Sequence, residues 1–517
     1  MSFAKVQSAQ TVFLEAHLID VEVDLAKGLH AFSIVGLPDK AVEEARDRVS
    51  AAIKNSNFKS PKQRNQKITI SLAPAEVKKE GSNFDLAIAL GYLLAAGDIK
   101  FNPDKKLFLG ELSLDGVVRP VKGVLPLVRK AAESGIEKVY VPKDNASEAA
   151  LISGITVYPV ADLEEIVDHL TFKKDTTGNI LEITPQPKTE IPRESRPAEI
   201  DLSDIHGQEN AKRALIIAAS GGHNVAFWGP PGTGKTMLAK ALAGILPQLS
   251  FDEVLEVTGI HSVAGNLGGK LVTNAPFRAP HHTASHVAVV GGGQSLRPGE
   301  ITLAHRGILF LDEFPEFDRR VLESLREPLE ERVISVARAK GTARFPAQFI
   351  LVAAMNPCPC GNYGVAKKTC ICLPGAIERY RRKMSGPIID RIDLWTEVSS
   401  ISHEKLSEEI VTRNESAAAR EKISLAREIQ KLRFKNNEKN ISTNAEMSVR
   451  ELAAHAILSD NVRNLLNESA RKLDLSPRSY HRVIKLARTI ADLDQKQNIE
   501  TSHILEALQY RPRKLTV

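Results

Sequence analysis

The clearest chemistry in this sequence lies in one glycine-rich stretch. The stretch comprises Gly229, Pro230, Pro231, Gly232, Thr233, Gly234, Lys235 and Thr236. It fits the pattern G-x-x-x-x-G-K-[ST], in which backbone N–H groups turn inward around phosphate oxygens. We expect Lys235 to reach the β- and γ-phosphates of a nucleotide and the Thr236 hydroxyl to bind Mg²⁺. An apolar run at 224–228 and a helix-forming run at 237–245 flank the stretch. The sequence therefore predicts a strand, a loop and a helix around an ATP or GTP site.

Two further apolar runs end in polar residues that suit nucleotide hydrolysis. The run 307–311 is followed by Asp312 and Glu313, and the run 349–355 is followed by Asn356. Ligands of open α/β sheets bind at the carboxyl ends of the strands. We expect Asp312 to hold Mg²⁺, mainly through water, and Glu313 to orient and polarise the attacking water. Asn356 is expected to hydrogen-bond the γ-phosphate or that water, so the pattern predicts hydrolysis and not binding alone.

The cysteines form a second candidate site. All four of them, Cys358, Cys360, Cys370 and Cys372, fall in one window with the spacing C-x-C-x₉-C-x-C. Such clustering argues against structural disulfides in a cytosolic chain. Four thiolates on one short loop predict a tetrahedral zinc site. Free thiols are the alternative, since twin C-x-C pairs are less usual than C-x-x-C.

Composition sets broad limits on the protein class. At 517 residues, with 43% hydrophobic and 26% charged residues, the chain is expected to form roughly two to four globular domains. No apolar run approaches the roughly 18 residues that cross a membrane, and no signal-peptide pattern opens the chain. We therefore expect a cytoplasmic protein with no membrane partner. The net charge of +6 permits a polyanionic partner but does not require one.

The order of predicted elements divides the chain into four parts. Residues 1–172 alternate strands and helices, which predicts a mixed α/β domain. Residues 173–199 are polar, rich in Pro and Thr and without period, and are predicted to be a linker. The ATPase core is expected over 200–398, and a helical C-terminal domain over 399–517.

A long glycine-rich segment separates the first two ATPase strands. Segments of this length inside a compact core are usually functional. The segment, Gly259–Gly299, contains Arg278, His281, His282 and His286. Metal binding by the histidines is disfavoured because no carboxylate pair or cysteine lies nearby in the sequence. We predict polar loop contacts instead, made by Arg278, His281 and His282.

A basic hairpin is predicted at 331–345. Its tip carries Arg338 and Lys340, and its return strand carries Arg344. Basic tips suit a phosphate backbone, which supplies most of the non-specific affinity for nucleic acid. A solvated hairpin tip is the alternative interpretation.

The segment 385–393, S-G-P-I-I-D-R-I-D, follows the strand that ends in Asn356. This order of a strand, an asparagine and a D-R-I-D segment resembles the order found in AAA+ ATPases of the magnesium-chelatase and MCM helicase branch. The resemblance implies that Arg391 is an arginine finger in the neighbouring subunit's site, in a hexameric ring. A salt-bridged surface arginine is the alternative interpretation. The resemblance also implies that Arg478 is a second sensor, with Arg482 as the next candidate.

In that branch, the glycine-rich insert and the hairpin before Asn356 face the ring channel. The resemblance therefore implies that Arg278, His281 and His282 are candidates for binding DNA.

Over nearly its whole length the chain resembles the ComM/YifB family of magnesium-chelatase-like AAA+ proteins. The motifs that carry the resemblance are G-P-P-G-T-G-K-T, F-R-A-P-H-H-T, L-F-L-D-E, N-P-C-P-C-G and S-G-P-I-I-D-R-I-D. The resemblance implies an α/β fold with a P-loop ATPase core, a helical C-terminal lid and an N-terminal Lon-protease-like domain of ribosomal S5 type. It also implies an ATP-driven hexameric helicase that promotes DNA branch migration during natural transformation, with recombination proteins as further partners. The DNA would be single-stranded, duplex or branched.

The Lon-like resemblance does not extend to the protease's Ser–Lys pair. Asp85 stands where the serine is expected, and Pro126 stands near the lysine position. Proteolysis is therefore not expected, although Ser82 and Lys122 leave a shifted register open. The basic loop 59–67 is either a DNA contact outside the ring or a solvated loop.

Three alternatives to the DNA translocase follow from the same residues. The first is an ATPase that remodels a protein complex, as the magnesium-chelatase subunits do. The second is a scaffold with a nucleotide switch, which Glu313 and Arg391 disfavour. The third is a Lon-like protease, which Asp85 and Pro126 disfavour.

Overall fold

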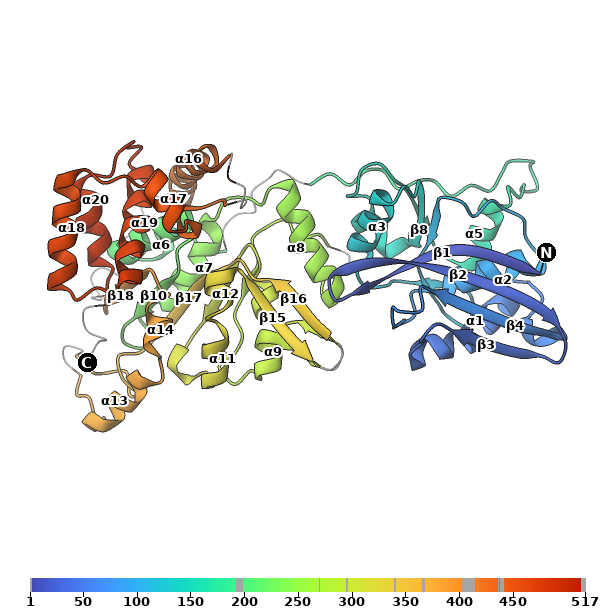
Figure 1. The fold of residues 1–517 in the computed structure, drawn as a ribbon, viewed down its shortest axis with the longest axis horizontal. Coiled ribbons are helices and arrows are strands. Elements are labelled where there is room, and N and C mark those ends of the chain that lie inside the picture. Colours follow the sequence, from blue (N-terminus) through green and yellow to red (C-terminus); the bar gives the residue numbers. More distant parts are fainter. Residues whose placement is uncertain are drawn as a thin grey trace. The chain divides into compact units, whose positions relative to one another are not determined.

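The computed structural model describes residues 2–191, 199–268, 270–293, 296–338, 341–364, 368–401, 414–435, 437 and 441–512. The chain divides into two compact units (Figure 1). The N-terminal unit comprises Met1–Pro192 and Phe251–Thr273, and the C-terminal unit comprises Arg193–Ser250 and Asn274–Val517. Among the residues described, no helix combines the length and apolarity needed to cross a membrane.

The N-terminal unit is built on a seven-stranded mixed sheet with the order β3-β4-β2-β1-β5-β8-β9. The strands are β1 (Phe3–Val12), β2 (Glu15–Lys27), β3 (Ala31–Val35), β4 (Gln66–Ala73), β5 (Lys106–Phe108), β8 (Lys138–Pro142) and β9 (Thr156–Val160). The principal helices are α1 (Lys40–Asn55), α2 (Asp85–Ala96), α3 (Val124–Glu133) and α5 (Leu163–Leu170). Strands β1, β2 and β4 pair antiparallel, whereas β1, β5, β8 and β9 pair parallel. The mixed α/β class predicted for this part is confirmed.

The residues considered for a protease site form other contacts in this unit. Asp85 begins α2 and is buried, and its carboxylate accepts hydrogen bonds from Arg48 Nε at 2.7 Å and Arg48 Nη2 at 3.1 Å. The Ser82 hydroxyl donates to the Glu111 carboxylate. Asp85 therefore joins α1 to α2, and the Ser82 hydroxyl is bound to the Glu111 carboxylate and not to the lysine that the protease pair requires.

Helix α8 (Phe251–Ala264) belongs to the N-terminal unit although it follows the P-loop helix in the sequence. It contacts α3, and its Ser262 carbonyl accepts a hydrogen bond from the Gly123 N–H at 3.2 Å. The Ser262 hydroxyl donates to the buried Glu148 carboxylate, which also accepts from the Leu125 N–H at 2.9 Å. The expected insert at 259–299 is thus divided, because its first part, through Thr273, packs in the N-terminal unit.

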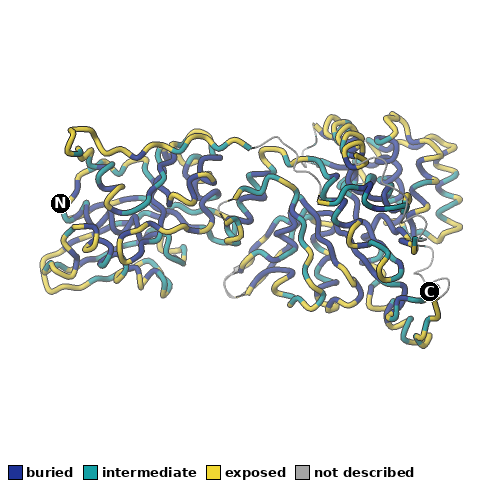
Figure 2. Tube along the Cα trace, turned by 180° about the vertical axis from the view of Figure 1, so that it is seen from behind, coloured by how far each residue is buried: buried dark blue, intermediate teal, exposed yellow. Residues whose placement is uncertain are grey.

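The C-terminal unit contains a five-stranded parallel sheet with the order β11-β14-β17-β10-β18. Its strands are β10 (Val225–Trp228), β11 (Phe277–Arg278), β14 (Ile308–Leu311), β17 (Ile350–Met355) and β18 (Leu394–Glu397). Every residue of β14 and β17 is buried (Figure 2). Continuous apolar runs of this kind are typical of parallel strands covered on both faces.

Helices, a hairpin and a short antiparallel pair, β12 (Gly291–Gly292) with β13 (Arg297–Pro298), accompany this sheet in the C-terminal unit. The larger helices are α6 (Glu209–Gly221), α7 (Lys235–Ile245), α13 (Pro374–Arg382), α16 (Glu415–Phe434), α17 (Val449–His455), α18 (Asp460–Lys472), α19 (Pro477–Leu493) and α20 (Thr501–Gln509). The shorter ones are α9 (His286–Val290), α10 (Glu300–Leu303), α11 (Arg319–Ser324), α12 (Pro328–Glu331) and α14 (Gly386–Ile389). The antiparallel hairpin consists of β15 (Val333–Arg338) and β16 (Gly341–Pro346). Apolar residues of the sheet and of the C-terminal helices share one core.

A buried acid joins the C-terminal helices to the sheet. The Asp393 carboxylate contacts Arg482 Nη1 of α19 at 2.5 Å and accepts a hydrogen bond from the Asn224 N–H at 3.0 Å. Burial alone would raise the pKa of Asp393, but the opposing effects, led by the charge of Arg482, outweigh it and hold this pKa well below its usual range. Arg482 is therefore engaged in a structural ion pair.

Candidate nucleotide site and cysteine cluster

The P-loop connects the end of β10 to the start of α7, as the sequence predicts. Gly232 and Gly234 have φ values of 78° and 89°, a left-handed conformation that favours glycine. The Lys235 ammonium donates hydrogen bonds to the carbonyls of Gly229 and Pro230, both at 2.8 Å, and to Asn356 Oδ1 at 3.2 Å. Burial lowers the pKa of Lys235, which makes this cation dependent on nearby acceptors. Phosphate oxygens would provide stronger, charged acceptors for the same ammonium.

The acidic pair lies beside the P-loop at the same edge of the sheet. Asp312 and Glu313 directly follow β14, and the Thr236 hydroxyl donates to Asp312 Oδ2 at 3.2 Å. A hydroxyl and a carboxylate in contact offer the hard oxygen ligands that Mg²⁺ prefers. The structure therefore brings Thr236, Lys235, Asp312 and Asn356 together, and the chemical roles assigned to them stay predictions.

Glu313 has a partner that the sequence does not indicate. Its backbone is left-handed, with φ 51°, and about half of its side chain is exposed. His282 Nδ1 lies 2.9 Å from Glu313 Oε2. The His282 ring packs against the His281 ring, with 4.2 Å between the centroids. The side chain expected to orient water is therefore held by a residue of the glycine-rich insert.

The two arginines implied by the family resemblance share one carboxylate. Arg391 Nη2 lies 2.6 Å from Glu330 Oε2, and Arg478 Nη2 lies 2.8 Å from Glu330 Oε1. The Arg391 side chain is 4% exposed, whereas that of Arg478 is 48% exposed. In the single chain Arg391 is thus buried in an ion pair, and a role in a neighbouring site requires it to leave Glu330.

The four cysteines converge as their spacing predicts. Their sulfur atoms all lie within 4.8 Å of one another, with Cys358–Cys360, Cys358–Cys370 and Cys360–Cys370 separations of 3.4, 3.7 and 3.6 Å. A tetrahedral zinc site with bonds of about 2.3 Å places its sulfurs roughly 3.8 Å apart, so the residues fit this metal. Backbone N–H groups of Asn362 and Ile371 lower the pKa of Cys360 to about 6. Such hydrogen bonds stabilise a thiolate.

The cysteine loop packs directly against the P-loop. Gly361 has φ 78°, and a Cβ atom placed there would lie 2.6 Å from Pro231 Cδ. Only glycine permits this approach without displacing the proline. The shape of the cysteine loop is therefore linked to the position of the P-loop tip.

The candidates for nucleic-acid contact differ in their availability. Arg278 forms a two-point ion pair with Glu300, with distances of 2.6 and 2.7 Å, so its guanidinium is engaged. His281 and Arg344 are exposed. The side chain of Arg338 and the whole of Lys340 lie outside the described residues.

The basic loop of the N-terminal unit is partly neutralised by acids elsewhere in that unit. Lys62 Nζ lies 3.0 Å from Asp47 Oδ1, and Arg64 Nη2 lies 2.6 Å from Asp98 Oδ1. Both ion pairs reduce the positive charge that the loop offers to a polyanion. The structure therefore favours the interpretation of 59–67 as a solvated loop.

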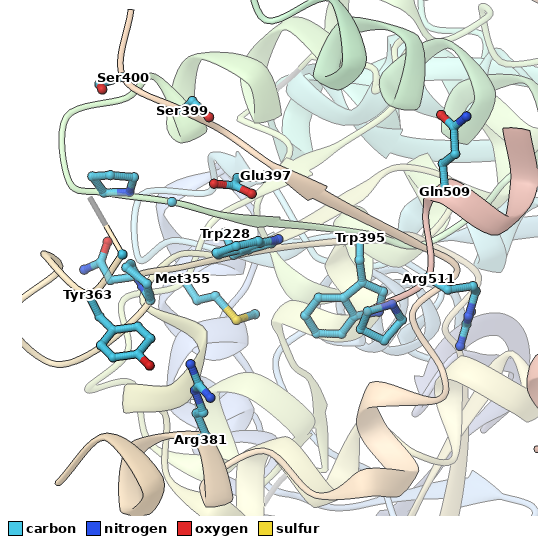
Figure 3. Close-up of a pocket in the computed structure, with 16 residues that line it drawn as sticks. Trp228, Met355, Tyr363, Arg381, Trp395, Glu397, Ser399, Ser400, Gln509 and Arg511 are labelled. Carbon is cyan, nitrogen blue, oxygen red and sulfur yellow. The ribbon is translucent and has the colours of Figure 1, made fainter. Parts of the chain in front are cut away.

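A cavity of about 680 Å³ borders the P-loop (Figure 3). Its lining includes Gly229 and Pro230 of the loop, Asn356, and the rings of Trp228 and Trp395. Arg381 lies over the ring of Tyr363, at 5.4 Å from the centroid, on another part of the lining. The cavity thus joins the phosphate-binding backbone to an aromatic surface.

Comparison with protein families identifies three matching regions. The family described as magnesium chelatase, subunit ChlI, matches residues 201–406. The family described as subunit ChlI of Mg-chelatase matches residues 21–145, and the ChlI C-terminal family matches residues 413–511. The matches therefore include parts of both units.

Curated relatives match along almost the whole chain. The competence protein ComM of Haemophilus influenzae is 44% identical over 99% of this chain and 98% of its own length. The YifB protein of Escherichia coli is 42% identical over 99% of this chain and 97% of its own length. A shorter match of 26% identity joins 30% of this chain to 20% of the DNA replication licensing factor mcm7 of Schizosaccharomyces pombe.

Nucleotide binding should change the fluorescence of the chain's two tryptophans, since both line the cavity beside the P-loop. When nucleotide phosphates accept hydrogen bonds from the Lys235 ammonium, this ammonium would no longer bind the carbonyls of Gly229 and Pro230. These carbonyls lie next to Trp228 in the chain. We expect a saturable change in emission when Mg²⁺ and ATP are added to the Trp395→Phe variant. The Lys235→Ala variant in the same background is the control, and an equal change there would contradict this account.

Proposed function

Because the chain belongs to the ComM/YifB family of magnesium-chelatase-like proteins, we propose that it is an ATP-driven, hexameric DNA translocase that promotes branch migration of recombination intermediates. The observation that carries the ATPase is the convergence of Lys235, Asp312 and Asn356 at one edge of the sheet. The relative named as a competence protein and the similarity to a replication licensing factor support DNA as the substrate.

The residues at the sheet edge would divide the work of hydrolysis. Lys235 and the P-loop N–H groups would bind the β- and γ-phosphates, while Asn356 would contact the γ-phosphate or the water. Mg²⁺, when held by Thr236 and Asp312, supplies positive charge to the phosphate oxygens. Glu313 would orient the attacking water once its carboxylate faces the nucleotide. The C-terminal helices would act as the lid of this site.

Arg391 and Arg478 are proposed to act on the nucleotide of a neighbouring subunit. The Glu330 carboxylate binds both guanidinium groups, which shows that they can contact one anion together. A γ-phosphate presented by a neighbour would compete with Glu330 for them. Head-to-tail contacts close into a ring when the rotation between subunits allows it, and the family resemblance supports six subunits in that ring.

Mixing variant and wild-type subunits tests this sharing of sites. In mixed rings, the fractional loss of ATPase rate should exceed the fraction of Arg391→Ala subunits, because each variant subunit impairs the wild-type site of its neighbour. Lys383→Ala, which removes an exposed cation paired with Glu316, is the matched control. A rate that falls only in proportion to the added Arg391→Ala subunits would contradict a shared site.

DNA should stimulate the ATPase, and added salt should weaken the stimulation steeply because phosphate contacts release counterions. We expect the stimulation across single-stranded, duplex and branched DNA, together with ATP-dependent strand exchange on three- and four-stranded substrates. Glu313→Gln, which should still bind ATP, is the control for hydrolysis. If none of these forms of DNA changes the rate of ATP turnover, the protein is not a DNA translocase.

Remodelling of a protein complex is the second candidate function. It is favoured by the match of residues 201–406 to the magnesium chelatase subunit ChlI family. The two functions use the same nucleotide site, but they differ in the partner that stimulates ATP hydrolysis there. An ATPase indifferent to DNA but stimulated by a partner protein would support remodelling.

The cysteine cluster is proposed to bind one structural zinc ion. The sulfur separations of 3.4–3.7 Å and the convergence of all four sulfur atoms support this assignment. Purified, reduced protein should contain about one zinc per chain by elemental analysis, because four thiolates bind zinc tightly. Cys370→Ser should lower the zinc content and the melting temperature, whereas full stability without any metal would exclude the site.

A further inference from the structure

The cysteine cluster lies beside the P-loop, and the hydrolysis scheme above makes no use of this proximity. We propose that the cluster is a thiol switch, in which a peroxide oxidises cysteines to a disulfide, zinc leaves and ATP binding at the P-loop weakens. The inference rests on the zinc site and the ATP site proposed above, because it assigns the regulation of the second to the first. The cysteines would act through Gly361 and Asn356 and would not touch the nucleotide.

Two contacts join the cysteine loop to the residues that would bind phosphate. Gly361, which directly follows Cys360, has φ 78°, and a Cβ atom there would lie 2.6 Å from Pro231 Cδ. Asn356, at the start of the same loop, accepts a hydrogen bond from the Lys235 ammonium at 3.2 Å. The loop therefore meets the P-loop at its tip and at its lysine, and a movement of the cysteines would reach both.

The sulfur atoms hold the loop in this shape. Cys358 is fully buried, its Sγ accepts a hydrogen bond from the Tyr363 N–H at 3.3 Å, and its carbonyl accepts from the Gly361 N–H at 2.9 Å. These bonds fix a tight turn around one sulfur. Zinc bound to this sulfur would connect the turn to the later pair, Cys370 and Cys372. Loss of zinc would leave the turn without that connection.

Oxidation would begin at the partly exposed cysteines Cys360 and Cys370, whose sulfur atoms lie 3.6 Å apart. One thiolate would attack hydrogen peroxide, which breaks the O–O bond, gives a sulfenic acid and releases hydroxide. The second thiolate would attack the sulfenic sulfur, form the S–S bond and release a second hydroxide. Two electrons thus pass to the peroxide, and both hydroxides take up protons to become water. Zn²⁺ leaves because two of its four thiolate ligands are lost.

Formation of this disulfide would move the loop against the P-loop. The two sulfur atoms must approach from 3.6 Å to about 2.05 Å, and Gly361 follows one of these cysteines directly. The close packing of Gly361 on Pro231 would transmit this movement to the P-loop tip. The sequence contains no cysteine outside this cluster, so every thiol-dependent change in ATP binding must originate here.

Hydrogen peroxide added to the reduced, zinc-containing protein tests the switch. We expect the mass of the chain to fall by two hydrogen atoms per disulfide and about one zinc ion per chain to be released. The Kd for ATP, measured by calorimetry, should rise several-fold. Dithiothreitol together with Zn²⁺ should restore the starting Kd, because it returns the thiolates. This restoration would distinguish the cysteines from methionine oxidation, which dithiothreitol does not reverse.

Two glycines of the loop separate the contact with Pro231 from backbone strain. Gly361 and Gly364 have φ values of 78° and 74°, so alanine is strained at both positions. A Cβ at Gly361 would meet Pro231, whereas no described atom lies within 4 Å of one at Gly364. In the reduced protein, Gly361→Ala should raise the Kd for ATP several-fold. Gly364→Ala is the matched control and should bind ATP as the wild type does.

The possible outcomes separate the switch from the sites on which it rests. A disulfide and free zinc with an unchanged Kd for ATP would overturn the inference alone, as would equal Kd values for the two glycine variants. Thiols that stay reduced in peroxide, or a loss of ATP binding that dithiothreitol and zinc do not reverse, would also overturn it. A reduced protein without zinc would overturn the zinc site and this inference together. A reduced protein that binds no ATP would overturn the ATPase as well.

Discussion

Parallel pairing of three neighbouring strands is the constraint on which the nucleotide site depends. Trp228 at the end of β10 pairs with Met355 at the end of β17, and Leu311 at the end of β14 pairs with Ala353. The residues that follow these strands must therefore emerge at nearly the same level of one sheet edge. The Lys235–Asn356 and Thr236–Asp312 contacts follow from this register. A shift of one strand would separate the groups without changing any of them.

Two residues of the D-R-I-D segment, which precedes β18 and therefore starts at the opposite edge of the sheet, contact different parts of the C-terminal unit. Asp393 is buried against Arg482 and the Asn224 backbone, and so ties α19 to the sheet. Arg391, two residues earlier, faces Glu330 with Arg478 of the same α19. A change in the position of α19 would therefore act on both arginine contacts. The ion pair of Asp393 and the ion pairs at Glu330 are thus connected through one short segment and α19.

The site could be predicted from the sequence wherever its residues follow a strand or lie close together in the chain. The P-loop, the Asp312–Glu313 pair, Asn356 and the cysteine cluster all have such local signals. The contacts of these residues with distant segments could not be predicted. His282 with Glu313, and Glu330 with two arginines, depend on side-chain directions that tertiary packing sets.

The fold was predictable to a similar degree and for the same reason. Strand and helix periodicity identified the main elements of both units, since burial of one face or of both faces leaves a pattern in the sequence. Nothing in the pattern of α8 indicates the unit to which it belongs. Its place against α3 follows from the Glu148 and Ser262 contacts. The ion pairs that neutralise Lys62 and Arg64 likewise join residues far apart in the chain.

The position of α8 has a consequence for how the protein can be divided. Because the N-terminal unit includes Phe251–Thr273, the polypeptide passes between the two units three times. A single proteolytic cut within 173–191 would therefore leave both products held together by the α8 contacts. A fragment that starts after Pro192 would keep α8 but lose α3 and Glu148, and would expose surface that the intact protein covers. The linker is thus a poor boundary for an isolated ATPase fragment, and a design that also replaces residues 251–273 is better suited.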